Sequence, residues 1–189
     1  MNVRTFLAVD VDDAIRKKAM KLIDHLRDTP AKVRWVRPET IHLTLQFLGD
    51  VPIQDIAKIS RLVAEATETM DAFPIDFQGV GAFPTPDKPR TVWAGVSQGI
   101  EPLRELHQKI QTKLEPLNFR PDRRQFIPHL TIGRVLKTTV GLDALANEIQ
   151  ANQDFALGSI LADEVVIFSS ELSPQGPIYE VLGRAPLNL

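Results

Sequence analysis

The chain has 189 residues, of which 43% are hydrophobic and 24% are charged, and its formal net charge is −2. These values are ordinary for a globular protein, and they argue against a long disordered region and against binding of nucleic acid through overall charge. The absence of cysteine excludes disulfides, thiolate metal ligands and a cysteine nucleophile. The longest apolar runs are too short to span a bilayer and the N-terminus shows no secretory signal, so we expect a cytoplasmic protein without a membrane partner.

The spacing of apolar residues in the first half predicts strands and helices in alternation. Strands are recognised by short apolar runs bounded by turn residues, and helices by apolar side chains three or four positions apart. In chain order the pattern predicts a strand at residues 4–11, a helix at 12–28, strands at 33–36 and 40–48, a helix at 52–70, and strands at 75–83 and 91–96. Asp12 or Asp13 can cap the first helix, because a carboxylate oxygen there can accept a hydrogen bond from a free backbone N–H group.

The second half repeats this order loosely. In chain order it predicts a helix at residues 101–117, a basic loop at 120–125, a strand at 126–135, a short helix at 142–150, and closing strands at 158–172 and 177–187. No linker rich in glycine, serine or proline separates the halves, which favours a single domain over residues 1–189. The repeated order, together with the nearly identical tetrapeptides HLTL and HLTI in the two halves, favours an α+β architecture of two pseudo-symmetric lobes.

Two of the four histidines lie in nearly identical apolar words, IHLTL around His42 and PHLTI around His129. Both words predict strands, and side chains along a strand point alternately to opposite faces. His42 and Thr44 therefore share one face, as do His129 and Thr131, while the leucines between them anchor each strand in a core. Each word presents one imidazole and one hydroxyl from a rigid strand.

Two such pairs facing each other across a cleft would form a phosphate site. The hydroxyls can donate hydrogen bonds to phosphate oxygens, a neutral imidazole can take a proton from water, and an imidazolium can protonate a leaving oxygen. One His-x-Thr pair means little, but two copies in one chain favour a functional site over packed side chains. A two-histidine metal site is the weaker alternative, because Glu39 is the only acidic residue close to either word. His25 and His107 lie among polar neighbours on helical patterns. We expect both to be solvated and assign them no functional role.

These words and the residues around them resemble the 2H phosphoesterase superfamily, which is named for two His-x-Thr/Ser-x motifs. Within it, the chain is similar to the RNA 2′,3′-cyclic phosphodiesterases, also called 2′-5′ RNA ligases. The resemblance covers nearly the whole chain and rests on residues 4–10, on IHLTLQFLG at 41–49, on the stretch from Phe83-Pro84 through Pro89-Arg90 to Trp93, and on PHLTIGR at 128–134. Both motifs are intact.

The resemblance implies a bilobal, duplicated α+β fold in which two antiparallel sheets form a concave cleft with the helices outside. It implies that His42 donates a proton to the leaving oxygen, that His129 accepts one from water, and that Thr44 and Thr131 hold the phosphate. The substrate would be an RNA end or a nucleotide with a 2′,3′-cyclic phosphate, and the product a 2′-phosphate formed by expelling the 3′ oxygen. We expect no metal, no cofactor and a monomer.

Arginines lie close to both words: Arg34 and Arg37 precede His42, and Arg120, Arg123, Arg124 and Arg134 flank His129. Arginine suits two-point contact with phosphate, so the basic loop either binds the RNA backbone or is a solvated loop paired with Asp122. Strict alternation places Arg134 on the face opposite His129, unless Gly133 breaks the strand with a bulge. The family tends to carry arginine at this place, and the sequence leaves open whether Arg124 and Arg134 contact substrate.

Three aromatic residues near the words, Trp35, Phe47 and Phe126, could stack on a base. Stacking requires a ring on the same face as the histidines. Phe47 shares its strand parity with Leu43 and Leu45, so we expect it to pack in the core instead.

Two alternatives to hydrolysis stay open. The same site could run in reverse and join tRNA halves through a 2′-5′ bond, and the sequence cannot separate the two directions. A non-catalytic module that binds RNA or nucleotides is the other alternative. Its expected signature is the loss of a histidine or threonine from one motif, and neither motif has lost one.

Overall fold

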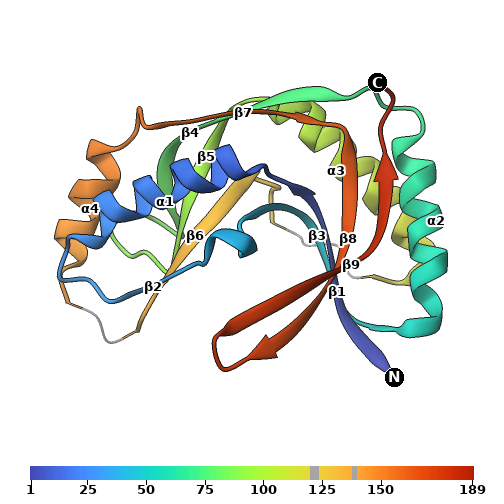
Figure 1. The fold of residues 1–189 in the computed structure, drawn as a ribbon, viewed down its shortest axis with the longest axis horizontal. Helices are drawn as coiled ribbons and strands as arrows, with labels where there is room; N and C mark the ends of the chain where they lie inside the picture. The colour runs from blue at the N-terminus through green and yellow to red at the C-terminus, as the bar shows by residue number, and fades with distance from the viewer. Residues whose placement is uncertain (120–123, 138–139) are drawn as a thin grey trace.

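The computed structural model describes residues 1–119, 124–137 and 140–189, in which strands and helices alternate along the chain (Figure 1). In chain order the elements are β1 (Asn2–Asp10), α1 (Asp13–Arg27), β2 (Val33–Trp35), β3 (His42–Pro52), α2 (Ile56–Thr67), β4 (Phe73–Phe83), β5 (Thr91–Gln98), α3 (Ile100–Leu114), β6 (His129–Val135), α4 (Leu142–Ala151), β7 (Ala156–Ala162), β8 (Glu164–Ser173) and β9 (Gly176–Pro186). With one exception, each predicted helix and strand has its counterpart here, and the ends differ by a few residues.

The exception is the segment 158–172, which was predicted as one strand and forms parts of two, β7 and β8. β7 pairs with β4, whereas β8 pairs with β1 at the other end of the sheet. Only Asp163 separates the two strands, and neither glycine nor proline lies at the break. The local pattern therefore gives no sign that the chain changes its partner there.

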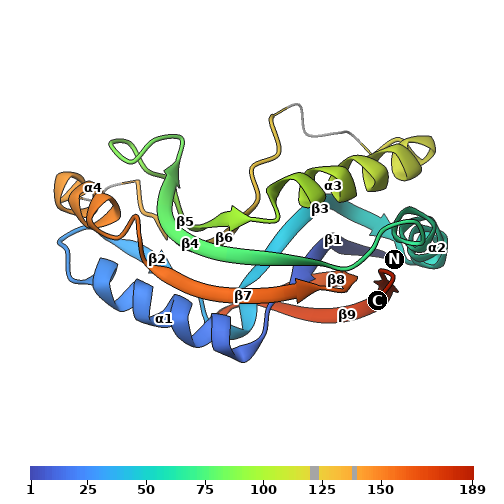
Figure 2. The same cartoon turned by 90° about the horizontal axis from the view of Figure 1, so that it is seen from above.

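The strands form one antiparallel sheet in the order β7-β4-β5-β6-β3-β1-β8-β9, with β2 added to the side of β6. The expected division into two separate sheets is not confirmed, because β3 pairs with β6 and so joins the two groups of strands. This junction is narrow, since its register consists of the pair Leu43 and Leu130. The sheet curls strongly along its length (Figure 2).

The helices pack against one face of this curled sheet and bury a large hydrophobic core there. α1 and α4 lie against β7 and β4, while α2 and α3 lie against β8, β9 and β3 (Figure 1). Leu43 and Leu130 both belong to this core and are fully buried. Burial of a leucine contributes about 1.5–3 kcal/mol, so the core holds both motif strands with their leucines facing the helices.

α1 shows how local sequence and long-range packing combine. Its cap is Asp12, whose carboxylate accepts a hydrogen bond from the backbone N–H of Ile15 at 2.9 Å. Its buried residues recur at the predicted helical spacing: Ile15, Ala19, Leu22, Ile23 and Leu26. The helix leaves β1 in one half of the sheet and packs against β7 in the other, which ties the halves together. None of the helices in the described parts of the chain is long and apolar enough to cross a membrane.

We predict that Leu130→Ala lowers the free energy of unfolding by about 2–5 kcal/mol, because it leaves a cavity at the junction of the sheet halves. The measurement is equilibrium unfolding in urea. Leu172→Ala is the matched control: Leu172 is 74% exposed, so its truncation is expected to change the free energy by less than about 0.5 kcal/mol. Equal effects of the two substitutions would contradict the central position of Leu130 in the core.

Candidate active site

The two motif words meet at the junction of the sheet halves. Their central leucines lie opposite each other in antiparallel strands, so the words run side by side in opposite directions. This register places His42 next to Thr131 and Thr44 next to His129, on the face of the sheet away from the core. All four side chains are half-buried, which leaves them accessible from that face.

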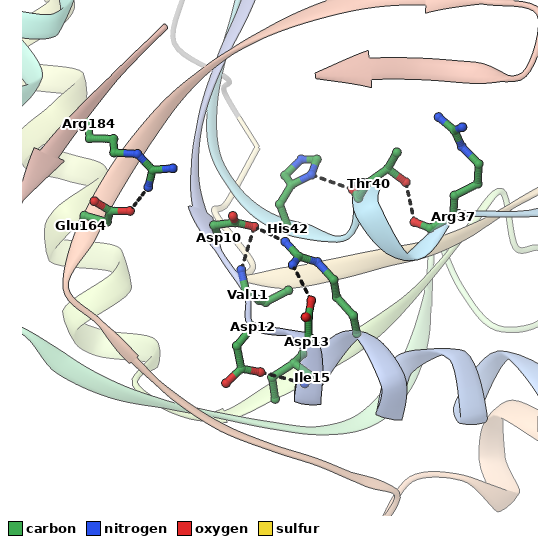
Figure 3. A network of polar contacts seen from close by, with 11 residues as sticks. Asp10, Val11, Asp12, Asp13, Ile15, Arg37, Thr40, His42, Glu164 and Arg184 are labelled. Carbon is green, nitrogen blue, oxygen red and sulfur yellow. Dashed lines mark hydrogen bonds and ion pairs between the residues drawn. The ribbon is translucent and has the colours of Figure 1, made fainter. Parts of the chain in front are cut away.

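The backbone orients both imidazoles in the same way. Nδ1 of His42 lies 2.8 Å from the carbonyl oxygen of Thr40 (Figure 3), and Nδ1 of His129 lies 2.7 Å from that of Ile127. Because a carbonyl oxygen only accepts, each Nδ1 donates a hydrogen and each Nε2 is left for chemistry. Nε2 of His42 lies 2.9 Å from the hydroxyl oxygen of Thr44, which donates to it while the imidazole is neutral.

Aromatic rings enclose His42. The ring of Phe6 lies 4.7 Å from the imidazole, and that of Tyr179 meets it edge-on at 5.3 Å. This burial lowers the pKa of His42 from 6.5 to about 4, because a medium of low polarity disfavours the imidazolium. The hydrogen bond to Thr40 and the negative charge of Asp10, the cross-strand partner on β1, act in the opposite direction and raise that pKa (Figure 3).

Aromatic rings also enclose His129, but the charge beside it is positive instead of negative. The ring of Phe83 meets the imidazole edge-on at 5.0 Å, and the indole of Trp93 lies 6.0 Å away. Burial lowers the pKa of His129, its backbone hydrogen bond raises the pKa, and the positive charge of Arg134 lowers it further. The permanently charged neighbours of the two histidines therefore differ in sign: a carboxylate acts on His42 and a guanidinium on His129. His129 itself also lowers the pKa of His42.

Each motif strand has an irregularity just after its threonine. The register of β3 against β1 skips Leu45, and the register of β6 against β5 skips Ile132. Such a bulge shifts the alternation of faces by one residue, so Phe47 and Arg134 turn onto the face that carries the histidines. These two residues hold equivalent places, each five positions after its histidine. The sequence left open on which face of the strand Arg134 lies, and the bulge places it on the histidine face.

The expectation that Phe47 packs in the core is wrong for the same reason. Phe47 is 65% exposed, and its ring lies 5.8 Å from that of Phe6 on the histidine face. The other two aromatic candidates pack against the core: Trp35 covers Gly133, and Phe126 stacks on His107 at 4.2 Å. His107 is thus a half-buried residue and not the solvated one expected.

Arginines gather at the edge of the histidine face. Arg34 of β2 lies directly opposite Arg134 of β6. Like charges in such a cross-strand pair repel each other, and a bound anion would relieve the repulsion. Arg37 donates a hydrogen bond to the carbonyl oxygen of Pro177 at 2.9 Å, which holds its guanidinium beside β9. The edge therefore suits an anionic ligand.

Tyr179 is a site residue that the sequence pattern does not reveal. It reaches His42 from β9, near the end of the chain, and it is the only tyrosine present. Burial raises the pKa of Tyr179, and the positive charges of Arg134, Arg4 and Arg37 lower it. Its hydroxyl therefore lies within the influence of the arginines as well as beside the first motif.

Three arginines of the basic loop and His25 complete the set of predicted polar candidates. Arg120 and Arg123 lie outside the described residues, and Arg124 is exposed. His25 is also exposed, as predicted, with Nδ1 at 3.0 Å from the amide oxygen of Asn152. Within residues 1–119, 124–137 and 140–189, no group of three or more His, Asp or Glu side chains is placed to hold a metal ion.

Comparison with known proteins gives consistent matches over most of the chain. A family model described as the 2′-5′ RNA ligase superfamily matches residues 6–171. An RNA 2′,3′-cyclic phosphodiesterase of Methanothermobacter thermautotrophicus is 38% identical over 95% of this chain and 96% of its own length. One of Archaeoglobus fulgidus is also 38% identical, over 95% of this chain and 98% of its own.

Solved structures share the fold. Escherichia coli LigT complexed with 3′-AMP superposes with a TM-score of 0.79 at 22% identity, covering 100% of both chains. The protein TT0787 of Thermus thermophilus gives a TM-score of 0.77 at 24% identity, covering 97% of each chain. The mixed architecture of helices on a curled antiparallel sheet is therefore a known one.

We predict that His42 makes folding stability fall on acidification. The pKa of about 4 in the folded protein lies below the 6.5 of an unperturbed histidine, so the unfolded state binds the proton more tightly between these values. Stability from this source is complete above pH 6.5 and decreases by about 3 kcal/mol as the pH falls to 4. The measurement is the free energy of unfolding in urea across this range, for the wild type and for His42→Gln. An identical pH dependence in both proteins would show that His42 is not buried in its neutral form.

Proposed function

The chain belongs to the 2′-5′ RNA ligase superfamily of 2H phosphoesterases, and on this premise we propose that it hydrolyses 2′,3′-cyclic phosphates at RNA ends to 2′-phosphomonoesters. The observation that carries the proposal is the junction of β3 and β6. It sets two imidazoles on one face, with Nδ1 of each held by a backbone carbonyl and with charges of opposite sign beside them. A paired acid and base require such an arrangement.

The charges beside the imidazoles support a division of labour. Asp10 favours the protonated form of His42, which suits it to give a proton to the leaving 3′ oxygen. Arg134 favours the neutral form of His129, which suits it to take a proton from the attacking water. The bond from phosphorus to the 3′ oxygen breaks as the bond to the water oxygen forms, and the phosphate stays on the 2′ oxygen.

Hydroxyl and guanidinium groups would hold the phosphate. The hydroxyls of Thr44 and Thr131 lie beside the imidazoles and can donate to its non-bridging oxygens. Arg134 and Arg34 face each other at the edge of the site and would share the negative charge. Phe47, exposed on the same face, offers a ring on which the terminal base can stack.

Both imidazoles are neutral at pH 7 without substrate, because burial lowers both pKa values. An anionic phosphate between them adds a negative charge, which favours protonation of a nearby imidazole. Asp10 acts on His42 in the same direction as the phosphate would, whereas Arg134 acts on His129 in the opposite direction. Binding of the substrate therefore creates the acid that the reaction needs.

The chain would work as one domain of two pseudo-symmetric lobes. From the edges inward, the strands run β7, β4, β5, β6 in one lobe and β9, β8, β1, β3 in the other. In each lobe the innermost strand carries the motif, the carbonyl two residues earlier orients the histidine, and a bulge follows the threonine. Such agreement in detail supports duplication of one unit.

Joining of RNA ends through a 2′-5′ bond is the second candidate, because the same acid and base could act on a 5′-hydroxyl that attacks in place of water. The name of the matching family favours it. A module that binds RNA without catalysis is less consistent with the site, since both imidazoles and both hydroxyls are in place.

We predict that His42→Ala and His129→Ala each lower the hydrolysis rate of 2′,3′-cyclic AMP by about 10²–10⁴-fold, the usual contribution of a general acid or base. Thr44→Val and Thr131→Val are the matched controls on the same strands, and we expect smaller losses because each removes one hydrogen bond. The measurement is kcat and KM with the fold checked by circular dichroism. A folded histidine variant with full activity would refute the paired mechanism.

We predict that activity on 2′,3′-cyclic AMP persists in EDTA, since the proposed charge stabilisation comes from hydroxyl, imidazole and guanidinium groups. The assay compares initial rates before and after dialysis against the chelator, with metal content measured in parallel. Loss of activity on removal of a stoichiometric metal, and its return on addition of that metal, would favour metal-assisted hydrolysis instead.

A further inference from the structure

A cavity of about 240 Å³ lies beside the second motif, and the reaction proposed above does not use it. Its walls come from β4, β5, the start of α3 and the residues just before β6, with a contribution from Gln153 after α4. No lining residue comes from β1, β3, β8 or β9, the strands of the first-motif lobe. The cavity therefore lies on the His129 side of the site.

Gly95 connects this cavity to His129. It is the cross-strand partner of His129 on β5, and it also lines the cavity. A Cβ atom at Gly95 would come within 2.7 Å of the carbonyl oxygen of Gln78, so a side chain cannot occupy this place without a shift of the backbone. Gly95 therefore presents no side chain beside the imidazole, and the ring of Trp93 lies close to this position. Trp93 and Pro128 line the cavity together with Gly95.

We propose that this cavity binds the nucleoside whose 5′-hydroxyl replaces water as the attacking group, so that it is the acceptor subsite for 2′-5′ bond formation. The inference rests on the proposed function, in which His129 acts on the attacking oxygen and His42 on the leaving one. In an in-line displacement these oxygens lie on opposite sides of the phosphorus. The group that carries the attacking oxygen must then extend beyond His129, where the cavity lies.

The transfer step is balanced without any further reactant. The 5′ oxygen of the acceptor forms a bond to phosphorus and gives its proton to His129, while the bond to the 3′ oxygen breaks and that oxygen takes a proton from His42. In the reverse reaction the 3′-hydroxyl attacks, the 2′-5′ bond breaks, and the acceptor nucleoside leaves through the cavity. The same subsite therefore serves synthesis and cleavage of the 2′-5′ bond.

The chemistry of the walls suits one nucleoside followed by a phosphate. Trp93, Ile100 and Pro128 provide apolar surface for a base or ribose, and the volume is below the roughly 300–1,000 Å³ of sites for drug-sized ligands. Arg104 adds a half-buried guanidinium on α3, paired with Glu101 of the same helix. In an RNA acceptor, the phosphate on the 3′ side of the first nucleoside can replace that carboxylate as its partner.

The test compares two substrates that share the donor nucleoside. 2′,3′-Cyclic AMP has no acceptor, whereas 2′-5′-linked adenylyl-adenosine carries adenosine in the proposed subsite. We expect Ile100→Trp, which fills the cavity, to lower kcat/KM for cleavage of the dinucleotide by about tenfold or more, chiefly through KM, and to leave hydrolysis of the cyclic nucleotide unchanged. Val96→Phe fills the same cavity from β5 and provides a second variant if the first is unstable.

Arg104→Gln tests the phosphate contact. We expect it to weaken cleavage of a dinucleotide that carries a 3′-phosphate on its second nucleoside, and to leave the dinucleotide without that phosphate unaffected. Lys113→Gln is the matched control, because Lys113 lies on the same helix and is paired at 3.1 Å with Glu65 of α2. A loss that is the same with and without the phosphate would overturn the role given to Arg104.

The outcomes separate this inference from the proposed function. A wild-type protein that hydrolyses cyclic AMP but does not cleave the 2′-5′ dinucleotide would overturn the acceptor subsite alone. Equal losses on both substrates in a folded cavity variant would place the donor nucleoside in the cavity, and no loss in either would show that the cavity is unused; both results overturn the inference. A wild-type protein inactive on both substrates would refute the proposed function as well.

Discussion

The pairing of β3 with β6 is the contact on which the site depends. A single residue pair, Leu43 opposite Leu130, joins the two halves of the sheet, and both leucines are buried in the core. Because the strands are antiparallel, this one pair sets the position of an imidazole and a hydroxyl on each side of it. A slip of either strand by one residue would turn its histidine and threonine into the core and its leucine out of it. Packing energy at the leucines thus fixes the geometry of the chemistry on the other face.

The two halves of the scaffold are nearly symmetric, but an acid and a base would need different surroundings. Both histidines are oriented by a backbone carbonyl two residues earlier, and both strands bulge at the same distance beyond them. The difference lies in what equivalent positions carry. Phe47 in one lobe corresponds to Arg134 in the other, so one half offers an apolar ring and the other a positive charge. Asp10 adds a negative charge on the side of Phe47. In the proposed reaction, these differences would make one histidine the acid and the other the base.

Much of this arrangement could be predicted from the sequence, where the cause is local. The capping of α1 by Asp12 and the opposite faces of histidine and leucine follow from spacing over a few residues. The bulges could not be predicted, because a skipped residue depends on the register with a neighbouring strand, and this is why Phe47 was misplaced. Tyr179 was missed because its position beside His42 follows from the strand order and not from any nearby residue.

The apolar surroundings of His42 connect binding to proton transfer. Rings such as Phe6 and Tyr179 exclude water, and the resulting low pKa keeps the imidazole neutral in the free protein. In that state the hydroxyl of Thr44 donates to Nε2, so the pair is satisfied without a ligand. In the proposed reaction, a bound phosphate would favour proton uptake by His42. Nε2 would then become a donor, and the Thr44 hydroxyl would be released to donate to the phosphate. On this proposal a single proton would both create the acid and free the hydroxyl, and both changes would depend on the negative charge of the substrate. Such a site would carry no charged acid in the free protein, and the acid would form only where a phosphate is bound.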